Sequence, residues 1–205
     1  ISRVGELLEQ NSAELFALAT REAGKTLNDG VAEVREAVDF AYYYAGEALK
    51  ITTPARGVVA CISPWNFPLA IFSGQVLAAL SVGNAVVAKP AEQTVLMAHR
   101  AVELMHQAGV PAAVLQLLPG QGDVVGAALT SDARIAAVCF TGSTDTAKLI
   151  DRAMAMNLPA DAPLIAETGG LNAMIVDSTA LPEQVVRDVL ASSFQSAGQR
   201  CSALR

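Results

Sequence analysis

The sequence predicts an α/β fold in which helices cover both faces of a parallel β-sheet. From residue 57 onward, short apolar segments of strand length alternate with segments of helical periodicity. Strands that are apolar on both faces are typical of a parallel sheet covered on both sides. With 205 residues, of which 52% are hydrophobic, the chain can bury a substantial core. Four prolines fall at joints between these segments: Pro111, Pro119, Pro163 and Pro182.

Each element follows from its own pattern of apolar residues. The N-terminal part predicts one helix over residues 2–23 and a second from about 28 to 45, with Asn28 or Asp29 as the cap of the second. The predicted strands are Gly57–Ile62, Asn84–Ala88, Val114–Leu118, Ile135–Phe140, Leu164–Ala166 and Ala173–Val176. The predicted helices between them cover about 68–80, 94–108, 122–130, 143–156 and 182–196.

Charge and cysteine content exclude several classes of protein. The formal net charge of −6 argues against nucleic-acid binding, which needs a basic face. The three cysteines are too few and too scattered for a disulfide framework or a metal site, so we expect no metal and a cytoplasmic location. The uncharged stretch between Arg56 and Lys89 is long enough to span a bilayer, but prolines, glycines and asparagines interrupt it. We therefore expect no membrane span.

Parallel sheets bind ligands beyond the carboxyl ends of their strands, which directs attention to four loops. In the loop after Ile62, Asn66 could donate hydrogen bonds to a developing oxyanion, or it is an ordinary turn residue. After the next strand, Lys89 and Glu92 could hold ribose hydroxyls. The alternative is a solvated cation and a glutamate that suits the first turn of a helix.

The other two loops carry glycines before helices. The loop after Leu118 has the spacing GxGxxxG, which differs from the dinucleotide fingerprint and is also compatible with a tight strand–helix joint. In the loop after Phe140, the helix start at Ser143 could bind a pyrophosphate, or Ser143 is an ordinary N-cap.

Two further residues carry reactive groups near the C-terminus. Glu167 ends a predicted strand beside two glycines, where apolar surroundings could make it a useful base. Cys201 follows the last predicted helix and is the candidate nucleophile. Cys61 and Cys139 lie inside apolar strands, where packing is the expected role.

Taken together, these motifs resemble the aldehyde dehydrogenase superfamily. They are REAGKT, PWNFP, KPAEQT, FTGST, ETGG and GQRC, in that order along the chain. Within the superfamily, the stretches AEVREAVDF, ISPWNFPLAIFSGQ and PLIAETGG are most similar to the glutamate semialdehyde (pyrroline-5-carboxylate) dehydrogenase module of proline utilization A. The resemblance implies a Rossmann-like NAD-binding domain over 57–166, preceded by a helical segment over 1–56. The start of a catalytic domain over 167–205 follows.

The resemblance also implies roles for individual residues. Cys201 matches the nucleophile, Asn66 the oxyanion donor together with the Cys201 N–H, and Glu167 the general base. Ser202 and Phe67 are candidates for contacting the substrate. The residues expected to contact NAD are Ile62, Ser63, Pro64, Trp65, Lys89, Glu92, Gly122, Gly126, Phe140, Thr141, Gly142, Ser143, Thr168 and Gly169.

The implied activity is the NAD-dependent oxidation of glutamate semialdehyde to glutamate in proline catabolism. The resemblance further implies a homo-oligomer and fusion to a flavin-dependent proline dehydrogenase. Both ends of the chain look cut, so we expect a fragment that lacks turnover by itself. The alternatives are a dehydrogenase for another aldehyde and a non-catalytic nucleotide-binding or scaffold module.

Overall fold

The computed structural model describes residues 1–205, which form two compact units, Ile1–Glu167 and Thr168–Arg205. The first unit contains a five-stranded parallel sheet with the strand order β3-β2-β1-β4-β5. Its strands are β1 Val58–Ile62, β2 Ala85–Lys89, β3 Leu115–Leu117, β4 Ile135–Thr141 and β5 Leu164–Glu167. The predicted parallel α/β fold is confirmed.

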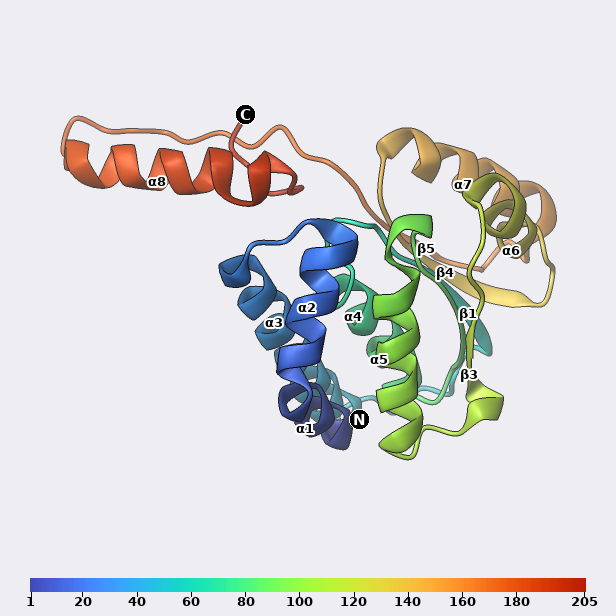
Figure 1. Ribbon diagram of the computed structural model, residues 1–205. Helices are drawn as coiled ribbons and strands as arrows, with labels where there is room; N and C mark the ends of the chain where they lie inside the picture. The colour runs from blue at the N-terminus through green and yellow to red at the C-terminus, as the bar shows by residue number, and fades with distance from the viewer. The chain divides into compact units, whose positions relative to one another are not determined.

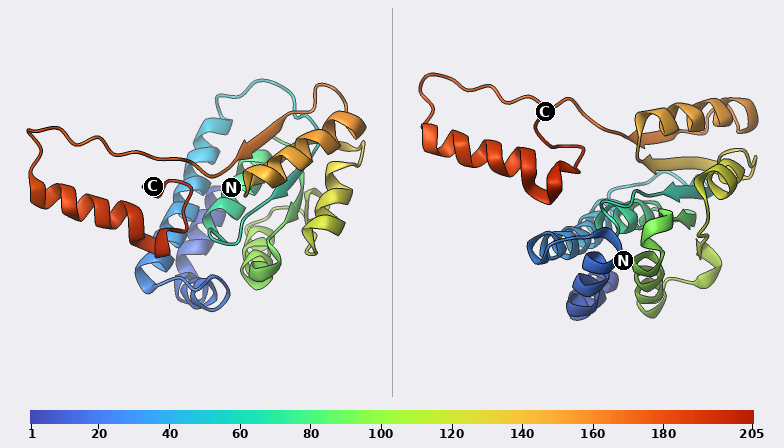
Figure 2. Two further views of the ribbon diagram at one scale, coloured as in Figure 1. Left: turned by 90° about the horizontal axis from the view of Figure 1, so that it is seen from above. Right: turned by 45° about the horizontal axis from the view of Figure 1, so that its top comes forward.

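Helices cover both faces of this sheet (Figures 1 and 2). The first face carries α1 Ser2–Gln10, α2 Ser12–Ala23, α3 Leu27–Ala48, α4 Ala70–Ser81 and α5 Val95–Gln107. The second face carries α6 Ala127–Thr130 and α7 Thr144–Asn157. The core therefore consists of two separate clusters of buried apolar side chains, one between the sheet and each layer of helices.

The central strand β1 explains why its sequence is apolar throughout. Val59 and Cys61 belong to the cluster under α1–α5, whereas Ala60 and Ile62 belong to the cluster under α6 and α7. Successive side chains of a strand point to opposite faces, so a central strand covered on both sides has no polar position.

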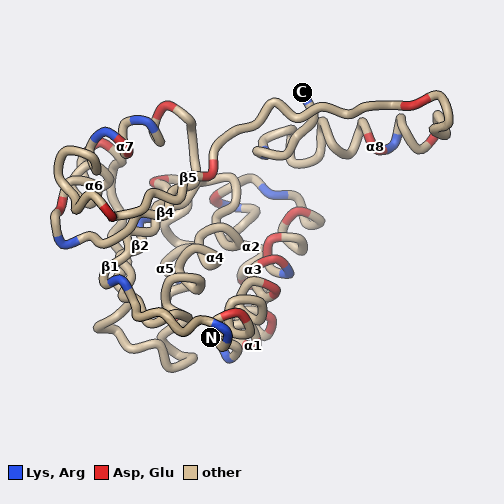
Figure 3. The backbone as a smooth tube through the Cα atoms, turned by 180° about the vertical axis from the view of Figure 1, so that it is seen from behind, with Lys and Arg blue, Asp and Glu red and all other residues tan.

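The N-terminal region differs from the prediction at two joints. The predicted helix over 2–23 is two helices, because the Asn11 side chain donates to the Leu7 carbonyl at 2.8 Å and ends α1 there. The cap of α3 is Thr26 rather than Asn28 or Asp29, and its Oγ1 accepts a hydrogen bond from the Asp29 N–H at 3.2 Å. Acidic residues are spaced along α3 (Figure 3).

Two further predictions need correction. The predicted helix over 122–130 is a π-helical turn, Gly122–Gly126, followed by the single turn of α6. Ala173–Val176 is not a strand; its residues are exposed, and the only bridge nearby joins Asn172 to Leu204. Apolar residues alone do not form a strand, because a strand needs a neighbour for its backbone groups.

The second unit contains one long helix, α8 Pro182–Phe194, beside an extended segment (Figure 2). None of the residues of α8 is buried. The structure contains no helix with both the length and the apolar composition that crossing a membrane requires. The three-way domain division remains a prediction, although residues 1–56 pack within the same compact unit as the sheet.

Candidate active site

The carboxyl ends of the strands bring four predicted loops to one edge of the sheet. Ile62 at the end of β1 pairs with Lys89 of β2 and with Phe140 of β4. Thr141 pairs with Glu167 at the end of β5. The strand order reverses direction between β1 and β4, which is where open α/β sheets form a ligand crevice.

Lys89 and Glu92 form a charged pair at the end of β2. Lys89 is 3% exposed, and its Nζ donates to the Pro90 carbonyl at 3.0 Å and lies 3.6 Å from Glu92 Oε1. The pKa of the Glu92 carboxyl is lowered, first by its own backbone N–H and further by the charge of Lys89 and the N–H of Gly122. A buried ammonium beside an ionised carboxylate offers both a donor and an acceptor to sugar hydroxyls.

The π-helical turn Gly122–Gly126 passes close to this pair. A Cβ on Gly122 would lie 3.7 Å from Glu92 Oε1, and one on Gly126 would lie 3.9 Å from the Lys89 Cδ and Cε atoms. Longer side chains at these positions would enter the space beside Lys89. The two glycines therefore keep the space beside Lys89 open. The GxGxxxG spacing gave only a weak prediction of this role, because it differs from the dinucleotide fingerprint.

This space is a cavity of about 340 Å³, which is within the usual size range of ligand pockets. It lies between the end of β2, the glycine turn and α7. Six of the residues that line it are Ile62, Lys89, Gly122, Gly126, Thr146 and Ile150. Apolar walls around one buried cation suit a flat aromatic ring joined to a polar sugar.

The loop after β4 forms the start of α7. Ser143 is the N-cap, and its Oγ accepts a hydrogen bond from the Thr146 N–H at 3.1 Å. A Cβ on Gly142 would lie 2.5 Å from the Phe140 ring, so only glycine fits there. Ser143 thus forms an ordinary cap. Because a cap leaves other N–H groups at the helix start exposed, an anion site remains compatible with it.

The loop after β1 is held at both ends. The Ser63 N–H donates to the Lys89 carbonyl at 3.1 Å. At the other end, the Leu69 and Ala70 N–H groups donate to Glu33 Oε2 at 3.0 and 3.1 Å. Asn66 lies between these points, next to the half-exposed Trp65.

Sequence reasoning missed the two charged residues beneath this loop, Glu33 and Lys25. Both are buried, and Lys25 Nζ lies 3.6 Å from Glu33 Oε1 and 4.5 Å from the centroid of the Phe67 ring. A signal was present, because Glu33 falls on the same helical face as the apolar Val34 and Ala37. A charged residue on an apolar face calls for a buried partner.

Glu167 and Cys201 belong to different compact units. Glu167 ends β5 with an exposed side chain, so the first unit alone does not provide the apolar surroundings that we expected for it. Its carbonyl accepts a hydrogen bond from the Gly142 N–H at 3.1 Å, which ties it to the turn before α7. Thr168 and Gly169 begin the second unit.

Cys201 lies on a fixed turn after α8. Its thiol is free and exposed, and Asn172 Nδ2 donates to its carbonyl at 2.6 Å and to that of Ala203 at 3.0 Å. Arg200 holds the same turn because its guanidinium donates hydrogen bonds to carbonyls of α8. The shortest of these hydrogen bonds, to the Ser192 carbonyl, is 2.7 Å long. The roles of Asn172 and Arg200 in this turn were not predicted. Both side chains donate hydrogen bonds to backbone carbonyls, and a sequence motif does not show such bonds.

The other two thiols have different surroundings. Cys61 and Cys139 occupy paired positions of β1 and β4. The hydrogen bond to Cys139 and burial raise the pKa of the Cys61 thiol well above its usual value. A buried thiol that stays protonated is a poor nucleophile. This agrees with the expected packing role of Cys61.

Comparison with known proteins identifies the family. A sequence model described as "Aldehyde dehydrogenase family" matches residues 1–205. The chain belongs to the aldehyde dehydrogenase family. Among curated aldehyde dehydrogenase relatives, the chain is 58% identical over 212 residues to "Bifunctional protein PutA" of Salmonella typhimurium, covering 100% of the chain and 16% of that protein. It is 38% identical over 220 residues to "1-pyrroline-5-carboxylate dehydrogenase" of Anoxybacillus flavithermus, covering 98% of the chain and 43% of that protein.

Solved structures give the same result for this aldehyde dehydrogenase chain. A structure of proline utilization A (PutA) with proline bound in remote sites matches with a TM-score of 0.95 and 54% identity over 100% of the chain and 23% of that protein. A Thermus 1-pyrroline-5-carboxylate dehydrogenase with bound NAD matches with a TM-score of 0.92 and 36% identity over 98% of the chain and 43% of that protein. The chain thus spans less than half the length of these relatives.

Proposed function

We propose that the chain is the cofactor-binding part, with the nucleophile turn, of an NAD-dependent aldehyde dehydrogenase that oxidises glutamate semialdehyde to glutamate. The single observation that carries the proposal is the buried Lys89, which pairs with the ionised Glu92 and lines a cavity that Gly122 and Gly126 also line. The relatives named above support the choice of substrate, because they are pyrroline-5-carboxylate dehydrogenases and PutA proteins.

The residues of the first unit fit NAD. Lys89 and Glu92 would hold the hydroxyls of the adenosine ribose, and the cavity beside Lys89 would hold the adenine ring. The N–H groups at the start of α7, which Ser143 caps, would hold the pyrophosphate. When bound, NAD supplies the hydride acceptor that the protein itself lacks. The remaining predicted contacts, such as Trp65 and Thr168, belong to the same proposal.

The catalytic roles follow the chemistry of each side chain. The Cys201 thiolate adds to the aldehyde carbon, and the resulting oxyanion accepts hydrogen bonds from the Asn66 amide and the Cys201 N–H. After the hydride leaves the carbon, a thioester on Sγ remains. Glu167 then removes a proton from the water that attacks this thioester, which releases the acid and the thiol. Phe67 and Ser202 contact the aldehyde's own substituents.

The wider context is part of the same proposal. We infer that this activity serves proline catabolism, which the proline utilization A relatives support. From the motif resemblance alone, we further infer a homo-oligomer and fusion to a flavin-dependent proline dehydrogenase. The free cysteines support a reducing, cytoplasmic location.

The test is NADH formation by the full-length protein that contains this chain, with glutamate semialdehyde as substrate. Cys201→Ala is expected to lower kcat by at least about a thousandfold, because the nucleophile is lost. Cys139→Ala is the matched control and is expected to keep kcat within about twofold of the parent. Oxidation at the parent rate by the Cys201→Ala variant would contradict the proposal. Binding of NAD without turnover of any aldehyde would favour the scaffold module instead.

A further inference from the structure

We propose that Glu33 and Lys25, a buried ion pair, position the Asn66 loop through their contacts with Phe67, Leu69 and Ala70. The loop joins β1 to α4, and Glu33 belongs to α3, which is distant from it in the sequence. The inference rests on the proposed role of Asn66 as the oxyanion donor, and it assigns a function to a buried ion pair that the proposed mechanism does not use.

The first step is the contact between Glu33 and the start of α4. Glu33 is 2% exposed, and its Oε2 accepts hydrogen bonds from the N–H groups of Leu69 and Ala70 at 3.0 and 3.1 Å. Ala70 is the first residue of α4, and Leu69 provides no side-chain cap. The Glu33 carboxylate of α3 therefore accepts hydrogen bonds from N–H groups at the start of α4 that have no acceptor within their own helix. Its negative charge also interacts favourably with the dipole of α4.

The second step is the contact between Lys25 and Phe67. Lys25 is 7% exposed, with Nζ 3.6 Å from Glu33 Oε1 and 4.5 Å from the centroid of the Phe67 ring. A buried ammonium needs a counter-charge, and Glu33 supplies it. The same ammonium attracts the face of the Phe67 ring. Phe67 directly follows Asn66, so the ion pair fixes the residue next to the proposed oxyanion donor.

The third step concerns what such a pair adds. A buried ion pair contributes little stability compared with apolar packing, because both charges lose their hydration. The ion pair does fix the position of the loop, since it contacts three residues that follow Asn66, namely Phe67, Leu69 and Ala70. An oxyanion donor acts within a narrow range of distances, and a displacement of about 1 Å costs about a hundredfold in rate.

The experiment is a double-mutant cycle in the full-length protein, with kcat for aldehyde oxidation and KM for NAD as readouts. Glu33→Gln keeps the size of the side chain but removes the charge that Lys25 and the helix start need. We expect kcat to fall by about ten- to a hundredfold while KM for NAD changes by less than about twofold. The matched control is Glu47→Gln, which changes a half-exposed carboxyl on the same helix that pairs with Lys50 instead, and it is expected to leave both constants unchanged.

The cycle is completed by repeating the substitution in the Asn66→Ala background. If Glu33 acts through Asn66, Glu33→Gln lowers kcat no further there. An equal loss of kcat in both backgrounds would mean that Glu33 has only a structural role and would overturn the inference. If Asn66→Ala alone leaves kcat unchanged, the proposed role of Asn66 fails, which is a separate outcome.

A second measurement keeps the inference testable if Glu33→Gln impairs folding of the full-length protein. Trp65, the only tryptophan of residues 1–205, precedes Asn66 in the loop. In the folded 205-residue chain, Lys25→Gln is expected to raise the acrylamide quenching of Trp65 by about twofold, whereas Glu47→Gln is expected to leave it unchanged. Quenching that is equal in all three proteins would show that the pair does not hold the loop.

Discussion

Lys89 and Glu92 place opposite charges 3.6 Å apart beside the cavity in which we propose that the nucleotide binds. The backbone N–H of Glu92, the charge of Lys89 and the N–H of Gly122 all favour the charged form and lower the pKa of the Glu92 carboxyl, so it is ionised at neutral pH as an ordinary glutamate is. An ionised carboxylate accepts hydrogen bonds from ribose hydroxyls and repels a phosphate at the same position. Under the proposed function, we infer that the charge of Glu92 favours NAD over NADP.

Glu92→Gln is expected to tighten NADP binding by on the order of tenfold while weakening NAD binding by a smaller factor. The amide keeps an acceptor for a hydroxyl but no longer repels the 2′-phosphate. Isothermal titration of both dinucleotides measures the two dissociation constants. Glu9→Gln, which changes an exposed carboxyl of α1, is the control. An unchanged ratio of the two constants in Glu92→Gln would contradict this role of the charge.

At the residue scale, the sequence predicted positions that end strands but not positions that act across the fold. Lys89 ends the apolar strand β2 and Ser143 lies two residues after the apolar strand β4, so a local pattern was sufficient to find them. Glu33 and Asn172 act on backbone groups far away in the sequence, at Leu69 and Cys201. A side chain that bonds to a backbone group has no partner side chain that could be recognised in the sequence. These residues were missed for that reason.

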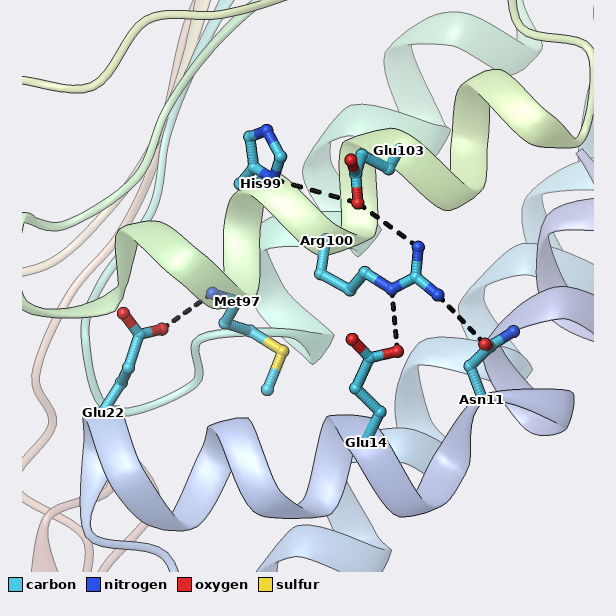
Figure 4. A network of polar contacts seen from close by, with 7 residues as sticks. All are labelled: Asn11, Glu14, Glu22, Met97, His99, Arg100 and Glu103. Carbon is cyan, nitrogen blue, oxygen red and sulfur yellow. Dashed lines mark hydrogen bonds and ion pairs between the residues drawn. The ribbon is translucent and has the colours of Figure 1, made fainter.

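The helices α2 and α5 are joined by a polar network (Figure 4). Glu22 of α2 accepts hydrogen bonds from the Leu96 and Met97 N–H groups at 2.9 and 2.7 Å. Arg100 of α5 donates to Glu14 Oε2 at 2.9 Å and to Asn11 Oδ1 at 3.1 Å. The start of α5, which follows the proposed ribose-binding residues, is therefore capped by a residue of α2.

Glu22→Ala is expected to lower the free energy of unfolding by about 1 kcal/mol, because two N–H groups at the start of α5 lose their acceptor. Urea denaturation followed by far-UV circular dichroism measures the change. The matched control, Glu9→Ala, removes an exposed carboxyl of α1 and is expected to have an effect below about 0.5 kcal/mol. Equal effects of the two substitutions would show that Glu22 does not cap α5.

The turn before β4 carries a pH-dependent contact. Hydrogen bonds from the Arg134 side chain and N–H lower the pKa of Asp132 from 3.8 to about 2. Because the folded-state pKa is the lower one, the contact stabilises the fold above pH 3.8, and this contribution is lost as the pH falls toward 2. Arg134→Ala is expected to raise the pKa of Asp132 toward 3.8, as measured by carboxyl NMR titration. An unchanged value, as expected for the control Arg152→Ala, would exclude the contact.

At the element scale, the predicted strands were correct wherever a neighbouring strand exists. The five strands from Val58 to Glu167 agree with the prediction within one residue at most ends, because burial on both faces leaves a clear apolar run. Ala173–Val176 has a similar composition but no strand beside it. Local composition cannot tell whether a partner strand is available.

The two compact units differ in how they are stabilised. The first unit has a core on each face of its sheet, whereas α8 of the second unit has no buried residue. Several large apolar side chains of the second unit are exposed: Leu171, Ile175, Leu181, Val186, Leu190 and Phe194. A helix without a buried face gains little from packing.

In the 205-residue chain, the backbone amides of α8 are therefore expected to exchange with deuterium at least about a hundredfold faster than those of β1 and β4. Hydrogen-exchange mass spectrometry resolves the two regions within one sample, so β1 serves as the internal reference. Protection of α8 equal to that of β1 would mean that a packing contact, not the helix alone, holds the second unit.

We propose that the carboxyl edge of the sheet binds NAD through Lys89. Equilibrium dialysis of NAD against the purified chain measures this binding. The wild-type chain is expected to retain NAD saturably at one site. Lys89→Met is expected to weaken binding by at least about tenfold, because the cavity loses its only buried cation. Lys148→Met, which changes an exposed lysine of α7, is expected to bind as the wild type does. Equal retention of NAD by the Lys89→Met and wild-type chains would contradict the account.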